Sequence, residues 1–196
     1  MTRRPYSPRR SSEARHEQLL DAALRVIDRD GYRGVSIDAV AREADVTRPV
    51  VYRIFEDLDS LLYALLDRQE ERILVQLAAV VAGDEVGQEP LIDGLRRLIE
   101  AVRADPPTWR PVLLAPTGTP AAVRKRVERD REQVRVQLEA VIAGLGLPAG
   151  MDAGVVAHAA LATAERFGQL ILEDPEGFDP EPVMDTVRAA LGTLGP

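Results

Sequence analysis

The chain has 196 residues, of which 45% are hydrophobic and 29% charged, as is ordinary for a soluble globular protein. It contains no cysteine, which excludes disulfides, thiolate zinc sites and cysteine nucleophiles. No apolar run approaches the roughly 20 residues that span a bilayer, and the basic N-terminus lacks the apolar core of a secretory signal. We therefore expect a cytoplasmic protein with no membrane partner.

The net charge of −7 is unevenly distributed along the chain. Residues 1–55 contain 11 Arg against 8 acidic residues, a net charge of +3, whereas residues 56–196 contain 14 basic against 24 acidic residues, a net charge of −10. Binding to phosphate depends on local fields, so this distribution favours contact with nucleic acid through the N-terminal part alone.

The chain begins with residues 1–11, which carry four arginines, two prolines and no acid. This composition predicts a disordered basic arm, which could contact phosphates or the minor groove of DNA. From Ser12 to Asp30 the spacing of apolar residues predicts a helix that ends at Gly31. The residues expected to face inward are Leu19, Leu20, Ala23, Leu24 and Ile27.

Residues 36–55 predict two short helices joined by a tight turn. Ser36 can cap the first helix by accepting a hydrogen bond from a free amide of its opening turn. The apolar stripe of that helix consists of Ile37, Val40, Ala41 and Ala44. Asp45 stands at the turn, where a short polar side chain tolerates a left-handed backbone.

The second short helix is predicted to have Thr47 as its cap and Pro49 in its first turn, where a missing amide costs little. Val51, Ile54 and Phe55 would pack inward. The outward side chains and the two caps are the candidate DNA-binding residues: Ser36, Thr47, Arg48, Val50, Tyr52 and Arg53. This layout is typical of a helix-turn-helix, whose second helix enters the major groove by its N-terminal end. The arginines could contact a guanine edge or a phosphate, and as arginines on any exposed helix they could do neither.

With the preceding helix, this segment resembles the DNA-binding domain of the TetR family of transcriptional regulators. The matching residues are Leu19-Leu20-Asp21-Ala22-Ala23, Gly31-Tyr32, Val35-Ser36-Ile37, Val40-Ala41, Ala44, Val46-Thr47, Tyr52-Arg53-Ile54-Phe55 and Leu61-Leu62. They cover about the first third of the chain. Two positions depart from the family pattern: Asp45 stands where glycine is usual, and Leu58 stands where a lysine often contacts a DNA phosphate.

The rest of the chain predicts further helices and almost no strand, which gives an all-α fold of about nine helices. The expected helices are residues 57–81, 91–104, 120–144, 152–173 and 179–194. The segment 105–120 contains five prolines and is expected to be a loop or a broken helix at best. The predicted domains are a helix-turn-helix head over 12–56 and a ligand-binding and dimerisation domain over 57–196.

The apolar positions of helices 57–81, 91–104 and 120–144 exceed what a simple bundle needs, which predicts a cavity for a small apolar ligand. The candidate lining residues are Leu65, Leu66, Trp109, Leu113 and Val134. Trp109 could instead pack in the core or in a hinge. No acidic cluster accompanies His16 or His158, and no P-loop, nucleophile elbow or dinucleotide fingerprint is present, so we expect no metal, no cofactor and no enzyme activity.

The last two predicted helices each carry a single apolar stripe, which predicts a homodimer interface. Its candidate residues are Val156, Ala160, Ala164, Phe167, Ile171, Val183, Val187 and Leu191. The resemblance implies that these helices pair with their copies as a four-helix bundle. The stripes could instead only cover the core of their own subunit.

The expected function, as the resemblance implies, is a repressor that a small molecule releases from a palindromic operator in double-stranded DNA. The alternative is a helical ligand-sensing or protein-interaction module with a degenerate DNA-binding head. Leu58 and the negative net charge support the alternative.

Overall fold

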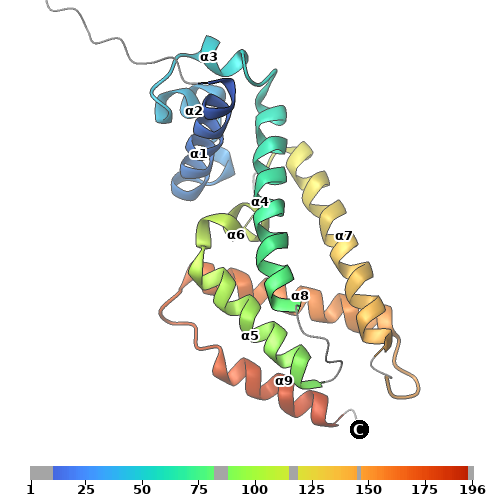
Figure 1. Cartoon of the computed structure of the whole chain (residues 1–196). Helices are drawn as coiled ribbons and strands as arrows, with labels where there is room; N and C mark the ends of the chain where they lie inside the picture. The colour runs from blue at the N-terminus through green and yellow to red at the C-terminus, as the bar shows by residue number, and fades with distance from the viewer. Residues whose placement is uncertain (1–10, 82–87, 115–118, 145–146, 194–196) are drawn as a thin grey trace, which may run out of the picture. The chain divides into compact units, whose positions relative to one another are not determined.

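The computed structural model describes residues 11–81, 88–114, 119–144 and 147–193 (Figure 1). Within these ranges the chain forms nine α-helices, one 3-10 helix and no β-strand, which confirms the predicted all-α fold. The elements are α1 (Ser12–Asp30), η1 (Tyr32–Gly34), α2 (Ile37–Glu43), α3 (Arg48–Tyr52), α4 (Leu58–Val81), α5 (Gln88–Ala104), α6 (Pro106–Leu113), α7 (Ala121–Gly144), α8 (Ala153–Glu173) and α9 (Glu181–Thr193). Apart from Ser11, the predicted basic arm lies outside the described residues.

The chain divides into two compact units, Met1–Leu65 and Leu66–Pro196. The boundary between them falls inside α4, whereas the sequence predicted it at the start of that helix. The opening turns of α4 carry Leu61 and Leu62, which are buried and belong to the first unit. One uninterrupted helix therefore supplies residues to both units.

The first unit is a helical head with a dense apolar core. Its α1 is capped by Ser11, whose Oγ accepts a hydrogen bond from the Ala14 amide at 3.1 Å. The buried residues of α1 are Leu19, Leu20, Ala22, Ala23, Val26 and Ile27. Leu24, predicted to face inward, is only half-buried, because the buried stripe runs through Ala23 and Val26 on either side of it.

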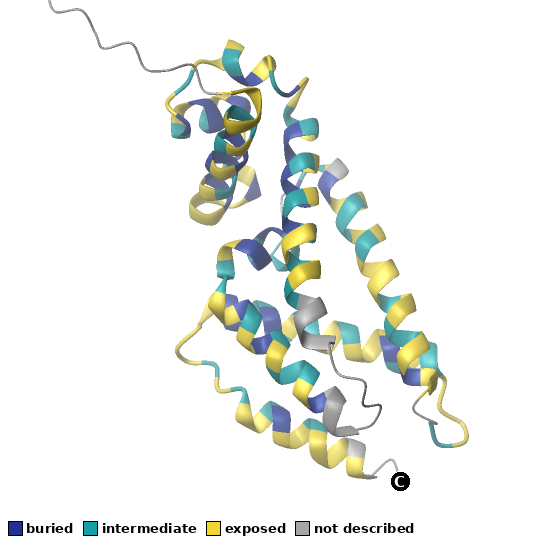
Figure 2. Cartoon of the chain, viewed as in Figure 1, coloured by how far each residue is buried: buried dark blue, intermediate teal, exposed yellow. Residues whose placement is uncertain are grey.

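The second unit has a core built from α5, α6, α8 and α9, while α7 packs against α8 (Figure 2). The buried members of this core are Ile92, Ile99, Val102, Trp109, Ile171, Leu172 and Met184. Burial of each large apolar side chain contributes about 1.5–3 kcal/mol, so this cluster is a main source of the unit's stability.

The structure adds detail to two sequence predictions for the second unit. The helix expected at 91–104 begins at Gln88, because Pro90 falls in its first turn, where no backbone donor is needed. The segment expected to be a loop or broken helix contains the eight-residue helix α6. Its first two prolines, Pro106 and Pro107, occupy the opening turn in the same way.

The third proline of α6, Pro111, lies inside the helix and cannot donate to the carbonyl of Pro107 one turn earlier. The side chain of Gln69, on α4, replaces the missing donor: its Nε2 donates to that carbonyl at 3.1 Å. A buried glutamine far away in the sequence thus supplies the donor that Pro111 lacks, and no local pattern in 105–120 indicates it.

Candidate nucleic-acid interface

The first helix of the predicted helix-turn-helix is held at both ends. The Oγ of Ser36 accepts a hydrogen bond from the Ala39 amide at 3.1 Å, which confirms the predicted cap. At the other end Asp45 has a φ of 52°, which confirms the predicted left-handed turn. The Val46 amide then donates to the Ala41 carbonyl at 2.9 Å and closes the turn.

A contact that the sequence did not indicate fixes this turn to α1. The Nε2 of Gln18 donates to the Ala44 carbonyl at 2.8 Å, and the Oε1 of Gln18 accepts from Arg15 at 2.7 Å. Gln18 therefore satisfies a carbonyl at the C-terminus of α2, one of the groups that a helix end leaves without a partner.

The second helix, α3, is short and presents several polar side chains to solvent. Its buried anchor is Val51, which is 0% exposed, while Tyr52 is 47% exposed and Val50 is half-buried. Thr47 occupies the N-cap position as predicted, but its side chain makes no capping hydrogen bond, so that part of the prediction was wrong. The hydroxyl of Thr47 is therefore not engaged by the helix it precedes.

Arg48, the first residue of α3, is held from two sides. Its Nε lies 3.2 Å from the Oδ1 of Asp38, on α2, and its Nη2 lies 3.5 Å from the hydroxyl of Tyr52. The guanidinium carbon is 6.0 Å from the centre of the Tyr52 ring, the outer limit of a cation–π contact. Tyr52 and Asp38 both raise the pKa of Arg48 above its ordinary value.

A second ion-pair group lies at the other end of α2. Glu43 accepts from Arg25 at 2.7 Å and from Arg29 at 2.9 Å, and these two arginines lower the pKa of its carboxyl. Both arginines belong to α1, so this group fastens α2 to α1. The acidic residues of α2 thus have separate contacts: Asp38 meets α3 and Glu43 meets α1.

In the second unit, a chain of polar contacts joins α4 to α6 around Trp109. The Nε1 of Trp109 donates to the Oε1 of Gln76 at 2.9 Å, and the Nε2 of Gln76 donates to Asp105 at 3.2 Å. Thr108 also donates to Asp105, at 2.6 Å. The fully buried Gln69 lies about two helical turns before Gln76 on α4, and its Oε1 has no hydrogen-bond partner.

The five candidate ligand-lining residues have different environments. Trp109 is buried in the core of the second unit, and Leu113 packs against that core. Leu66 is buried in the second unit, whereas Leu65 is buried in the first. Val134 is 44% exposed on α7. The structure therefore brings Trp109 and Leu113 into one cluster and leaves Val134 on the surface.

The candidate dimer residues also divide into exposed and internal positions. Ile171 is buried in the core of its own unit, and the half-buried Phe167 has its ring centre 5.8 Å from that of Phe178. Ala160 is exposed, and Val187 packs against the core of the second unit. Val156, Ala164 and Val183 are half-buried, and the side chain of Leu191 lies outside the described residues.

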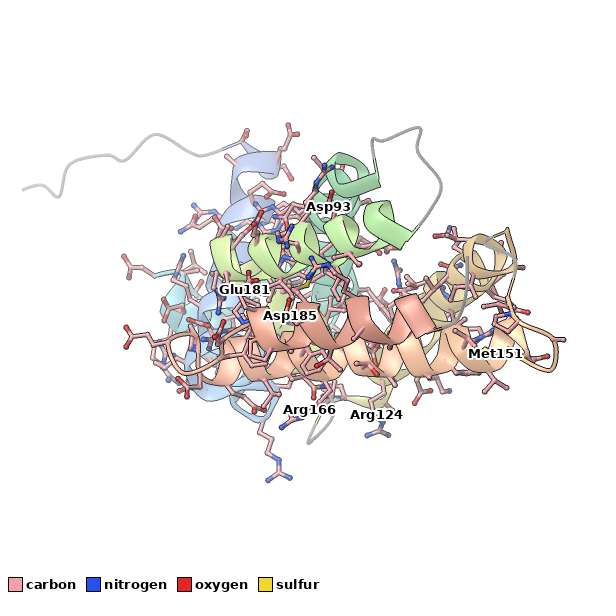
Figure 3. All side chains as sticks on the ribbon, turned by 90° about the horizontal axis from the view of Figure 1, so that it is seen from below. Asp93, Arg124, Met151, Arg166, Glu181 and Asp185 are labelled. Atoms are coloured by element: carbon pink, nitrogen blue, oxygen red, sulfur yellow. The ribbon has the colours of Figure 1, made fainter. Side chains whose placement is uncertain are left out.

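The exposed faces of α8 and α9 combine small and charged side chains. Figure 3 shows this part of the unit from below, with Arg166 on α8 and Glu181 and Asp185 on α9. Val155, at the start of α8, is 66% exposed. In the described ranges no helix is long and apolar enough to cross a membrane, and no group of three His, Asp or Glu residues could hold a metal ion.

Comparison with known proteins gives relatives for both units. The profile of bacterial regulatory proteins of the tetR family matches residues 19–65. An uncharacterized HTH-type transcriptional regulator of Mycobacterium tuberculosis strain H37Rv is 31% identical over 144 residues, which cover 72% of this chain. The chain spans only 59% of that relative's length.

Solved structures match over nearly the whole chain. A TetR-like transcriptional regulator from Rhodococcus sp. RHA1 has a TM-score of 0.76 at 20% identity, and the match covers 96% of this chain and 100% of the other. AibR, solved in complex with isovaleryl coenzyme A and operator DNA, has a TM-score of 0.72 at 21% identity, with 90% and 97% covered. At these identities the two structures establish the fold alone.

Proposed function

We propose that this chain, a member of the TetR family of bacterial regulatory proteins, is a DNA-binding transcriptional repressor that a small molecule releases from its operator. The observation that carries the proposal is the outer face of α3. It presents Arg48, Tyr52 and Arg53 to solvent on a helix anchored by the fully buried Val51. Arginines on a recognition helix suit guanine edges and phosphates.

The remaining candidate residues fit the same surface. The Thr47 hydroxyl is not used in capping and is available to a phosphate. Val50 is half-buried and suits contact with a thymine methyl group. Ser36 contributes through its cap, because that cap fixes the helix on which α3 packs. The net positive charge of residues 1–55 favours phosphate at this end of the chain.

Binding as a homodimer would allow two heads to contact a palindromic operator, with half-sites about one helical turn apart. We assign the interface to α8 and α9, where Ala160 and other small exposed side chains allow close approach of a partner helix. Since bacterial operators lie in the cytoplasm, the protein would act there.

The ligand is proposed to bind in the second unit beside α4 and α6. AibR was solved with isovaleryl coenzyme A, and this chain shares its fold. The orphaned Oε1 of Gln69 supports a ligand that carries a hydrogen-bond donor next to an apolar body, because a buried acceptor left unpaired costs about 1–3 kcal/mol. Such a ligand needs only different affinities for the DNA-bound and released arrangements.

The experiment is a selection from a library of randomised duplexes with the full chain, followed by affinity measurements on the enriched sequence. Arg48→Ala and Tyr52→Ala should each weaken specific binding roughly ten- to a hundredfold. Arg129→Ala, which removes an exposed arginine on α7, is the matched control and should leave affinity near wild type. Unchanged affinity in both α3 variants, with intact circular dichroism, would place the DNA-binding surface elsewhere. A wild-type selection that enriches no sequence would favour the alternative of a helical module with a degenerate head.

A further inference from the structure

We infer that Asp38 is a positioning residue that orients Arg48 toward a guanine and so sets the base preference at one position of the operator. The inference rests on the proposed function, because it assigns a role to a residue that does not itself contact DNA. Its structural basis is the 3.2 Å contact between the Oδ1 of Asp38 and the Nε of Arg48.

The atom of Arg48 that Asp38 contacts determines what remains available to DNA. A guanidinium has five N–H donors arranged around a planar fork, and Nε carries only one of them. Contact at Nε leaves both terminal nitrogens available, and these are the groups that bind the O6 and N7 of guanine together. Tyr52 competes weakly for Nη2, because their separation of 3.5 Å is at the limit of a hydrogen bond.

Asp38 is placed on a rigid support. It lies in the first turn of α2, directly after the Ser36 cap and the buried Ile37. Arg48, in contrast, is an exposed side chain with many rotamers, whose freedom is lost when it binds a base. An ion pair to a fixed carboxylate removes part of that freedom before DNA arrives, which favours one direction of approach.

The carboxylate of Asp38 also discriminates against the wrong contact. It neutralises the charge of Arg48 and would repel a phosphate brought close to the pair, whereas a guanine edge carries no net charge. Asp38 thus weakens non-specific attraction to the DNA backbone and leaves base recognition intact. Replacing Asp38 with asparagine should therefore raise affinity for unrelated DNA while it lowers selectivity.

The test compares base preferences of full-length variants in the same duplex selection. Arg48→Ala identifies the operator position that Arg48 recognises. Asp38→Asn should reduce the preference at that position about tenfold and tighten binding to a scrambled duplex. Glu43→Gln is the matched control, because it removes the same charge from the same helix at an ion pair that meets α1. It should leave the preference unchanged.

Two further variants show whether the effect passes through Arg48. In the Arg48→Ala background, Asp38→Asn should change no base preference. In the wild-type background, Asp38→Glu keeps the carboxylate and should therefore retain more of the wild-type preference than Asp38→Asn does. Wild-type preference in Asp38→Asn, or an equal change in Glu43→Gln, would overturn the inference while the proposed function stands. A wild-type selection that enriches no sequence would remove the proposed function and this inference together.

Discussion

Arg126 fastens α7 to α4 within the second unit, and replacing it should destabilise that unit. Its side chain is only 15% exposed and meets three carboxylates. Nη1 lies 2.7 Å from Asp67, Nε lies 2.7 Å from Asp130, and Nη2 pairs with Glu70. Two of these partners belong to α4, so the arginine links two helices that are far apart in sequence.

The expected loss of unfolding free energy depends on how exposed each carboxylate partner of Arg126 is. The Asp67 carboxylate is 60% exposed, so that pair contributes at most about 0.5 kcal/mol. Glu70 and Asp130 are 35% and 25% exposed, and hydrogen bonds to such partly buried charges contribute more, up to about 1.5 kcal/mol for the two together. Arg126→Gln should therefore lower the free energy of unfolding by up to about 2 kcal/mol.

Arg135 provides a matched control on the same helix. Its side chain is 14% exposed and pairs with Glu132 at 2.7 Å and Glu139 at 2.6 Å. Both partners lie on α7 itself, so Arg135→Gln removes only contacts within one helix and should cost much less than Arg126→Gln.

Urea unfolding followed by Trp109 fluorescence measures the right unit, because the chain's single tryptophan lies in the core of the second unit. The loss in Arg126→Gln should shrink in high salt, since part of it is electrostatic. Equal losses in the two variants, or a loss below about 0.5 kcal/mol for Arg126→Gln, would refute the assignment of Arg126 as a link between helices.

Three other outcomes are expected. Gln76→Leu should leave the indole N–H of Trp109 without its partner, lower the stability of the second unit by about 1 kcal/mol and shift the fluorescence emission; an unchanged spectrum would contradict this. Ala160→Glu and Phe167→Glu should yield folded monomers by sedimentation at micromolar concentration, and persistent dimers would place the interface elsewhere. The pKa of Glu43 is lowered by Arg25 and Arg29, so its contribution to stability should be complete above about pH 4.5 and disappear as pH falls further; a stability difference from Glu43→Gln that persists at pH 2 would disprove it.

Local signals predicted most of the fold. Helical periodicity, the Ser36 cap and the short polar residue at Asp45 act within a few residues of one another, so they are visible in the sequence. The prolines of 105–120 predicted a loop or a broken helix, and the short helix α6 found there receives a donor from Gln69, which lies on another helix. Prolines alone favour a loop, and only the tertiary structure shows which donor replaces the one they lack.

The candidate site also combines features that local sequence signals predict with contacts that only the tertiary structure shows. The outward face of α3 follows from periodicity, because Val51 fixes which side is buried. Periodicity does not reveal the partner of Arg48, because Asp38 reaches Arg48 only when the turn brings α2 and α3 together. The sequence also places Ile171 and Ala160 on one stripe, although the structure buries the first and exposes the second. Apolar spacing alone cannot separate a subunit's own core from a surface left for a partner.

The bond from Gln69 to the Pro107 carbonyl also constrains how this chain can change over generations. As long as Pro111 lacks an N–H, an apolar residue at position 69 leaves the part-buried carbonyl of Pro107 without its side-chain donor. Once alanine replaces Pro111, the backbone N–H of residue 111 can donate to the Pro107 carbonyl, and the residue at position 69 no longer has to supply that donor. The two replacements are therefore accessible in one order, proline first, and a lineage that altered Gln69 first would have to pass through a less stable protein.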